Sequence, residues 1–163
     1  MSAVFWEFLH PFFLWAYHSA IGTAIRESTW GFAWLEVFHL FGLTILLGSI
    51  VMRSLRLAGL FFRHRPMSKV TLALAPWTGL GMVLMAVSGA LMFASDAMRY
   101  YESEPFHIKL GLLCVAFGLH FTWFRKASRD EGRMSPWVGK VTAAVTLLVW
   151  ISVGFAGRAI AFF

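Results

Sequence analysis

Long apolar runs separated by short polar stretches dominate the chain. Four of these runs are long enough to cross the roughly 30 Å hydrocarbon core of a bilayer as helices. They cover about residues 32–52, 70–95, 106–124 and 138–162. The pattern predicts an all-α integral membrane protein, with a bundle of four transmembrane helices formed by residues 29–163.

Residues 1–28 are rich in Phe and Trp but are interrupted by polar groups such as Glu7 and His10. The segment has neither a basic start nor a small-residue cleavage site, so a signal peptide is not expected. Its aromatic residues suit the membrane–water interface. We therefore predict an interfacial amphipathic helix, or a pair of half-helices, on the outer surface. The alternative, a fifth crossing, would need a very tight hairpin before the first span.

Composition narrows the class of protein further. Only 13% of the 163 residues are charged, about half the share that a soluble domain usually carries, and 59% are hydrophobic. A typical soluble enzyme and a disordered tail are thereby excluded. The single cysteine, Cys114, excludes an intrachain disulfide and a cysteine-rich zinc site.

The basic residues are concentrated between the predicted spans. Ten of the fourteen Lys and Arg residues fall within residues 53–69 and 125–140. Such loops stay in the cytoplasm of bacterial membrane proteins, so we expect a bacterial inner-membrane protein with both termini in the periplasm. Because these charges flank apolar spans, nucleic-acid binding is not predicted despite the net charge of +6.

Ionisable side chains inside the spans are the strongest functional signal, because they are costly in a bilayer. Counting about 1.5 Å per residue from the outer end places Glu36, Lys109 and Arg158 at one depth, roughly 5–6 Å. Their charges predict an ion-pair layer near the outer face. The alternative is that the side chains reach separately toward the headgroups.

His39 lies one turn below Glu36, at a depth of about 10 Å. A haem b site needs an imidazole for the iron, apolar walls, and Lys or Arg for the propionates. We therefore predict His39 as an axial ligand, with Lys109 and Arg158 near the propionates. The alternative is a structural histidine that hydrogen-bonds to a neighbouring carbonyl.

The second ligand is less well defined. The same count places His120 about 10 Å deeper in the membrane than His39. Either helix tilt brings both histidines to one haem, or the protein holds two haems. His107, at the start of the third span, is a weaker candidate because it would be solvated there. Three methionines of the second span offer a thioether, although methionine more often fills a core. They are Met82, Met85 and Met92.

Several motifs resemble an uncharacterised bacterial family of four-helix membrane proteins. They include Glu36-Val37-Phe38-His39-Leu40-Phe41-Gly42, Leu55-Arg56-Leu57-Ala58-Gly59, Ala75-Pro76-Trp77-Thr78-Gly79 and Phe93-Ala94-Ser95-Asp96-Ala97. The resemblance covers most of the chain and implies the fold without an activity.

The chain is also distantly similar to HemJ-type protoporphyrinogen oxidases and to CopD-type copper-resistance membrane proteins. HemJ proteins have a histidine in an early helix, and a later helix that opens with His-x-Lys and carries a further histidine. Here these positions are His39, His107, Lys109 and His120. The resemblance implies haem b binding with His39 as a ligand.

Together these observations predict a small b-type cytochrome with one or two haems. It would pass electrons between the quinone pool and a periplasmic redox partner, as a subunit of a larger membrane complex. Two alternatives stay open. One is a HemJ-like protoporphyrinogen oxidase, and the other is a non-redox subunit with a structural or copper-handling role.

Overall fold

The computed structural model of the protein describes residues 3–62, 64–126, 135–160 and 162, and every regular element in these ranges is a helix. Four helices are long and apolar enough to cross a membrane, which confirms the predicted fold class. The elements are α1 (Ala3–Tyr17), α2 (Ala20–Glu27), α3 (Gly31–Leu57), α4 (Met67–Ser95), α5 (Ala97–Glu102), α6 (Glu104–Leu119), the π-helix η1 (His120–Phe124) and α8 (Pro136–Ala159).

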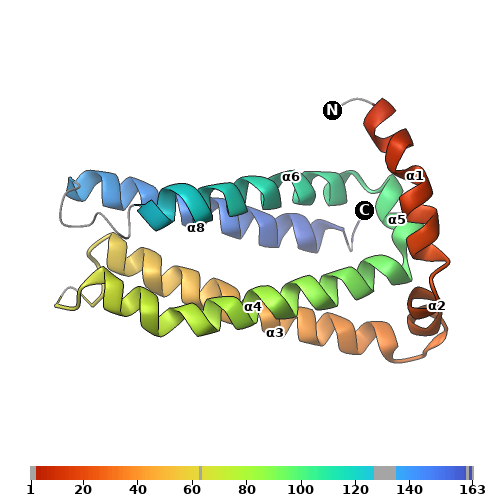
Figure 1. Ribbon diagram of the computed structural model, residues 1–163, viewed down its shortest axis with the longest axis horizontal. Coiled ribbons are helices and arrows are strands. Elements are labelled where there is room, and N and C mark those ends of the chain that lie inside the picture. The colour runs from red at the N-terminus through yellow and green to blue at the C-terminus, as the bar shows by residue number, and fades with distance from the viewer. Residues whose placement is uncertain (1–2, 63, 127–134, 161, 163) are drawn as a thin grey trace.

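The spanning helices form two antiparallel hairpins, one of α3 and α4 and the other of α6 with η1 and α8 (Figure 1). Within the first hairpin, glycines allow close packing. A Cβ added at Gly81 would lie 2.7 Å from the Leu46 backbone nitrogen, and one at Gly42 would lie 2.8 Å from Leu84 Cβ. The hairpins join mainly through α3 and α8.

Helix α3 continues five residues beyond the predicted end of the first span, because the added residues include Leu and Arg, which are good helix formers. Gly59 then ends it with a φ of 73°, a left-handed conformation that favours glycine. The Leu60 N–H donates to the Leu55 carbonyl at 2.9 Å, as expected for such an end. Arg53 and Arg56 therefore belong to the last turns of α3 rather than to a loop.

Helices α1 and α2 lie across one end of the bundle, together with α5 (Figure 1). The contact of α1 with α5 is aromatic and small, and it buries Phe13, Ala16, Ala97 and Tyr100. Helix α2 packs on α4, where the Arg26 guanidinium donates to the Ser95 carbonyl at 2.7 Å. Neither α1 nor α2 is among the four candidate spans.

The C-terminal end of α8 lies at the same end of the bundle as α1, and the connection from α3 to α4 lies at the opposite end (Figure 1). The residues predicted to face the periplasm and those predicted to face the cytoplasm are thus separated by the length of the bundle. The orientation itself, and the bacterial inner membrane as location, stay predictions.

Candidate functional site

Two adjoining cavities lie between the hairpins. The first, of about 470 Å³, is almost entirely apolar and is called the apolar cavity below. The second, of about 460 Å³, is called the charged cavity because it is lined by Glu36, Arg99, Lys109 and Arg158 besides His39. His39 and Lys109 line both, and each volume is within the roughly 300–1,000 Å³ typical of ligand sites.

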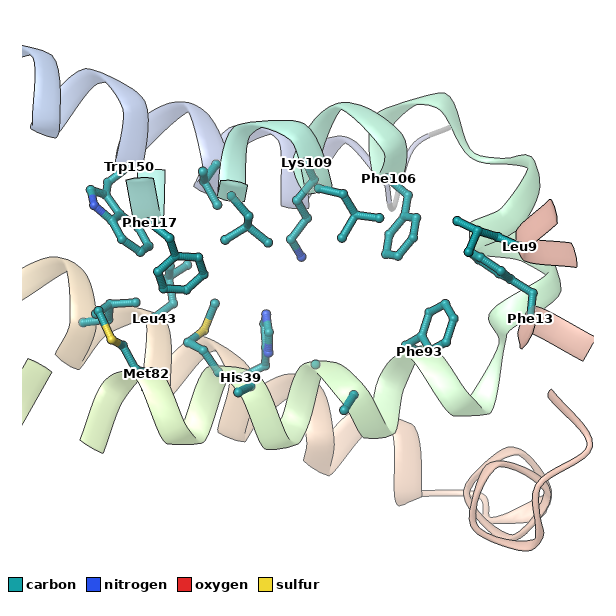
Figure 2. Close-up of a pocket in the computed structure, with 18 of the residues that line it drawn as sticks. Leu9, Phe13, His39, Leu43, Met82, Phe93, Phe106, Lys109, Phe117 and Trp150 are labelled. Carbon is teal, nitrogen blue, oxygen red and sulfur yellow. The ribbon is translucent and has the colours of Figure 1, made fainter. Parts of the chain in front are cut away.

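The apolar cavity has two main walls, one from α4 and one from α6, that face each other (Figure 2). Residues spaced by three or four positions point into it from each helix. They are Met82, Met85, Ala86, Gly89, Ala90 and Phe93 on α4, and Phe106, Lys109, Leu110, Leu113 and Phe117 on α6. Two facing helices with a gap between them suit a flat ligand.

Aromatic rings close the cavity toward α1. The rings of Phe93 and Phe106 stack with centroids 5.9 Å apart and an angle of 13°. Phe13 of α1 meets the Phe93 ring edge-on at 5.0 Å. Figure 2 shows these three side chains together at one end of the cavity. The N-terminal helix α1 is thus part of the wall.

His39 is held by a hydrogen-bond chain to α4. Its Nδ1 lies 2.9 Å from the Ser88 hydroxyl, which donates its own proton to the Leu84 carbonyl. A serine hydroxyl has a single proton, so Ser88 accepts from His39 and Nδ1 carries the hydrogen. Nε2 then keeps its lone pair. This is how ligating histidines are usually oriented, with the second nitrogen donating to a neighbour.

Gly89 allows the His39 ring to lie against α4. A Cβ at this position would be 3.2 Å from His39 Cε1, a tighter contact than nine in ten real Cβ contacts. Ser88 and Gly89 together therefore fix the orientation of the imidazole, a role that the sequence did not assign to either residue.

Lys109 extends from α6 into the cavity toward the His39 ring on the opposite wall (Figure 2). A Cβ at Gly157 of α8 would lie 3.4 Å from Lys109 Nζ. The ammonium group therefore lies close to α8 at a position that has no side chain. Among the described residues Lys109 forms no ion pair.

The charged cavity brings together the predicted layer of Glu36, Lys109 and Arg158. Arg158 and Glu36 are 3.8 Å apart and partly exposed, so this ion pair is weak. Arg99 of α5 lines the same cavity, giving three cations for one carboxylate. This excess of positive charge favours a ligand with an acidic group.

His120 does not share a site with His39. It lines neither cavity and is only 6% exposed, with its ring stacked on Phe124 at 5.6 Å. The reason is its position on the helix. Lys109 lies opposite His39. His120 follows Lys109 by eleven residues along the same span, which places it roughly 16 Å from Lys109 at the helical rise per residue. Helix tilt thus does not bring the two histidines to one haem.

His107 also lies apart from the cavities. Its ring stacks on Trp6 of α1, with centroids 3.6 Å apart and an angle of 20°, so it is covered rather than solvated. The methionines lie closer to His39. Met82 lines the apolar cavity, Met92 the charged cavity, and Met85 both.

Among the described residues, no group of three or more His, Cys, Asp or Glu side chains could hold a metal ion. A copper site made from such ligands is therefore not seen in this part of the chain. A haem makes a smaller demand, because one or two protein ligands suffice.

Comparison with known proteins identifies a family but no activity. No curated protein and no solved structure matches the chain, so the predicted similarity to HemJ-type and CopD-type proteins has no support from these comparisons. A family model matches residues 12–163, nearly the whole length. The chain therefore belongs to DUF6644, a family of unknown function.

Proposed function

We propose that the protein is a b-type cytochrome that holds one haem b between its two hairpins, with His39 as an axial ligand. The observation that carries the proposal is the His39–Ser88–Leu84 hydrogen-bond chain, which leaves the Nε2 lone pair of His39 beside a ligand-sized cavity. Haem iron supplies one-electron redox chemistry, whereas the protein supplies the ligand, the walls and the charges.

The surroundings of His39 match the rest of the cofactor. The apolar cavity offers facing helices of aromatic and aliphatic side chains for the ring. The charged cavity offers Lys109 and Arg158, with Arg99 beside them, for the two propionates. These three cations would hold the acidic groups of the cofactor near α5 and the end of α8.

Among the described histidines only His39 lines either cavity, so no second histidine would reach a cofactor held there. Met85 lines both cavities and is the thioether best placed for this role. We therefore propose one haem with a single histidine ligand.

The proposed task is electron transfer between the quinone pool and a periplasmic redox partner, within a larger membrane complex. Nearly all described residues belong to helices of the bundle or its end. Many large apolar side chains are exposed along the spans, as expected for surfaces that face lipid or other subunits.

The test is to purify the full chain in mild detergent from cells with ample haem. A dithionite-reduced minus oxidised absorption spectrum should show haem b bands, and a pyridine haemochrome assay should give one haem per chain. A folded but colourless protein would contradict the proposal.

A further inference from the structure

The apolar cavity reaches the surface of the bundle between α4 and α6. Four of the residues that line it are also exposed, two on each of these helices. They are Ala86 and Ala90 on α4, and Leu110 and Phe117 on α6. Because side chains from both walls line the cavity and are exposed at the same time, the cavity opens sideways along the gap between the walls (Figure 2).

The other sides of the apolar cavity are covered. Leu46 of α3 and Val153 of α8 line it from behind and are only 2% and 3% exposed. Buried aromatic side chains close its two ends, with Phe13 of α1 at one end and Trp150 of α8 at the other (Figure 2). In the described part of the chain, the gap between α4 and α6 is therefore the uncovered side of this cavity.

A second opening leads from the charged cavity to the surface between α3 and α8, where Leu40 lines the cavity and is exposed. Here the two helices pack against each other, and the ion pair of Arg158 with Glu36 crosses between them. Helices α4 and α6 have few close backbone contacts within the described ranges, and their side chains meet where Phe93 stacks on Phe106. The α4–α6 opening is thus the less obstructed of the two.

The surface beside the α4–α6 opening is apolar. Both helices present large aliphatic side chains that are more than 50% exposed. They are Val83 and Val87 on α4, and Ile108 and Val115 on α6. Both helices are also long and apolar enough to span a membrane, so this surface suits contact with lipid hydrocarbon rather than with water.

The charges that attract an acidic ligand lie inside this opening. Lys109 extends from α6 into the cavity between the two walls (Figure 2). Arg99 and Arg158 line the adjoining charged cavity. A ligand that comes from the lipid therefore meets apolar walls first and cations afterwards. This order suits a molecule with a wide apolar body and carboxylate groups, which is the composition of haem.

We propose that haem enters and leaves the apolar cavity sideways from the lipid, through the opening between α4 and α6. The inference rests on the function proposed above and adds the route by which the cofactor is loaded. It assigns to Ala86, Ala90 and Leu110 the rim of the opening, whereas His39 and the cations hold the cofactor inside.

The test bridges the opening with a chemical link. Ala90→Cys and Leu110→Cys place one thiol on each side of it, and Cys114→Ser removes the native exposed thiol. The full chain is loaded with haem in detergent, and a reducible bis-thiosulfonate reagent then joins the two thiols, as checked by mass spectrometry. An excess of a soluble haem-binding protein takes up the released haem, followed by absorbance. We expect the bridge to slow release several-fold or more, and a reductant to restore the rate.

A matched bridge across the other opening serves as the control. Leu40→Cys and Gly154→Cys line the charged cavity from α3 and α8, and joining them should leave the release rate unchanged. An unchanged rate with the α4–α6 bridge, or slower release with the α3–α8 bridge alone, would overturn the lateral route while the bound haem still supports the proposed function. A folded protein that takes up no haem would overturn both.

Single substitutions test the same route if the cysteine variants do not fold. Ala86→Trp narrows the opening and should slow the uptake of haem by the apoprotein several-fold, as followed by stopped-flow absorbance. Val87→Trp adds the same ring to the neighbouring exposed position, which lines neither cavity, so its uptake rate should equal that of the wild type. Equal uptake rates in the two variants would contradict the lateral route.

Discussion

The Ser88 hydroxyl lies 2.9 Å from His39 Nδ1 and itself donates to the Leu84 carbonyl. This relationship determines which imidazole nitrogen carries the proton, and it leaves Nε2 as the nitrogen with a free lone pair. Ser88, to which the sequence assigned no role, thus supports His39, the predicted haem ligand.

Ser88→Ala removes the acceptor that orients His39. Loss of such a partner commonly weakens metal binding about 10–100-fold, and we expect haem affinity of this variant to fall in that range. Titration of haem into the apoprotein, followed by absorbance, measures the affinity. Ser152→Ala is the matched control, since Ser152 makes the same type of bond to a carbonyl of its own helix but is exposed. Equal affinities in the two variants would argue against the role of Ser88.

Gly89→Val tests the close approach of His39 to α4. The added side chain would collide with the imidazole, because a Cβ at residue 89 would lie only 3.2 Å from His39 Cε1. We expect the variant to lose most of its haem while remaining helical. Gly79→Val places the same residue on the same helix where nothing lies within 4 Å, so it should retain haem. Haem content per chain and far-UV circular dichroism provide the comparison.

Lys109→Met should lower the midpoint reduction potential of the bound haem. A cation beside the cofactor favours the state with the additional electron, and its removal should shift the potential by on the order of tens of millivolts, since 59 mV is a tenfold change for one electron. Redox titration with optical detection measures the shift. Lys140→Met, an exposed position at the other end of the bundle, should leave the potential unchanged. A potential unaffected by Lys109→Met would indicate that the ammonium lies away from the haem.

Because Tyr100 on α5 is buried, we expect the folded protein to lose stability in alkali. Burial raises the pKa of its phenol above the ordinary value of about 10, and the Asp96 carboxylate adds to the effect. Because the pKa is higher in the folded state, the neutral phenol contributes stability that is complete below about pH 10 and is lost as the pH rises through the folded pKa. Tyr100→Phe lacks this loss, so its Tm should decline less steeply in that window. Parallel declines in Tm would contradict the assignment.

Sequence patterns predicted the fold well because apolar length is a strong signal for membrane helices. They also predicted that Glu36, Lys109 and Arg158 come together, since counting residues from one end gives depth directly. They missed Arg99, because the six-residue helix α5 is too short to show a periodic pattern. They also placed Arg53 in a loop, although α3 continues past it.

Contacts between helices were harder to predict than depth. The partner of His39 across the cavity is set by how the hairpins rotate and pack, and this brings Lys109, not His120, to its level.

The most direct test compares His39→Ala and His120→Ala with the wild type, using reduced minus oxidised spectra of protein purified from haem-replete cells. Both substitutions remove one imidazole from a spanning helix, so each serves as the control for the other. The account predicts that His39→Ala loses the haem b bands while remaining folded and that His120→Ala retains them. Bands that survive in His39→Ala, or that disappear only in His120→Ala, would contradict His39 as the axial ligand.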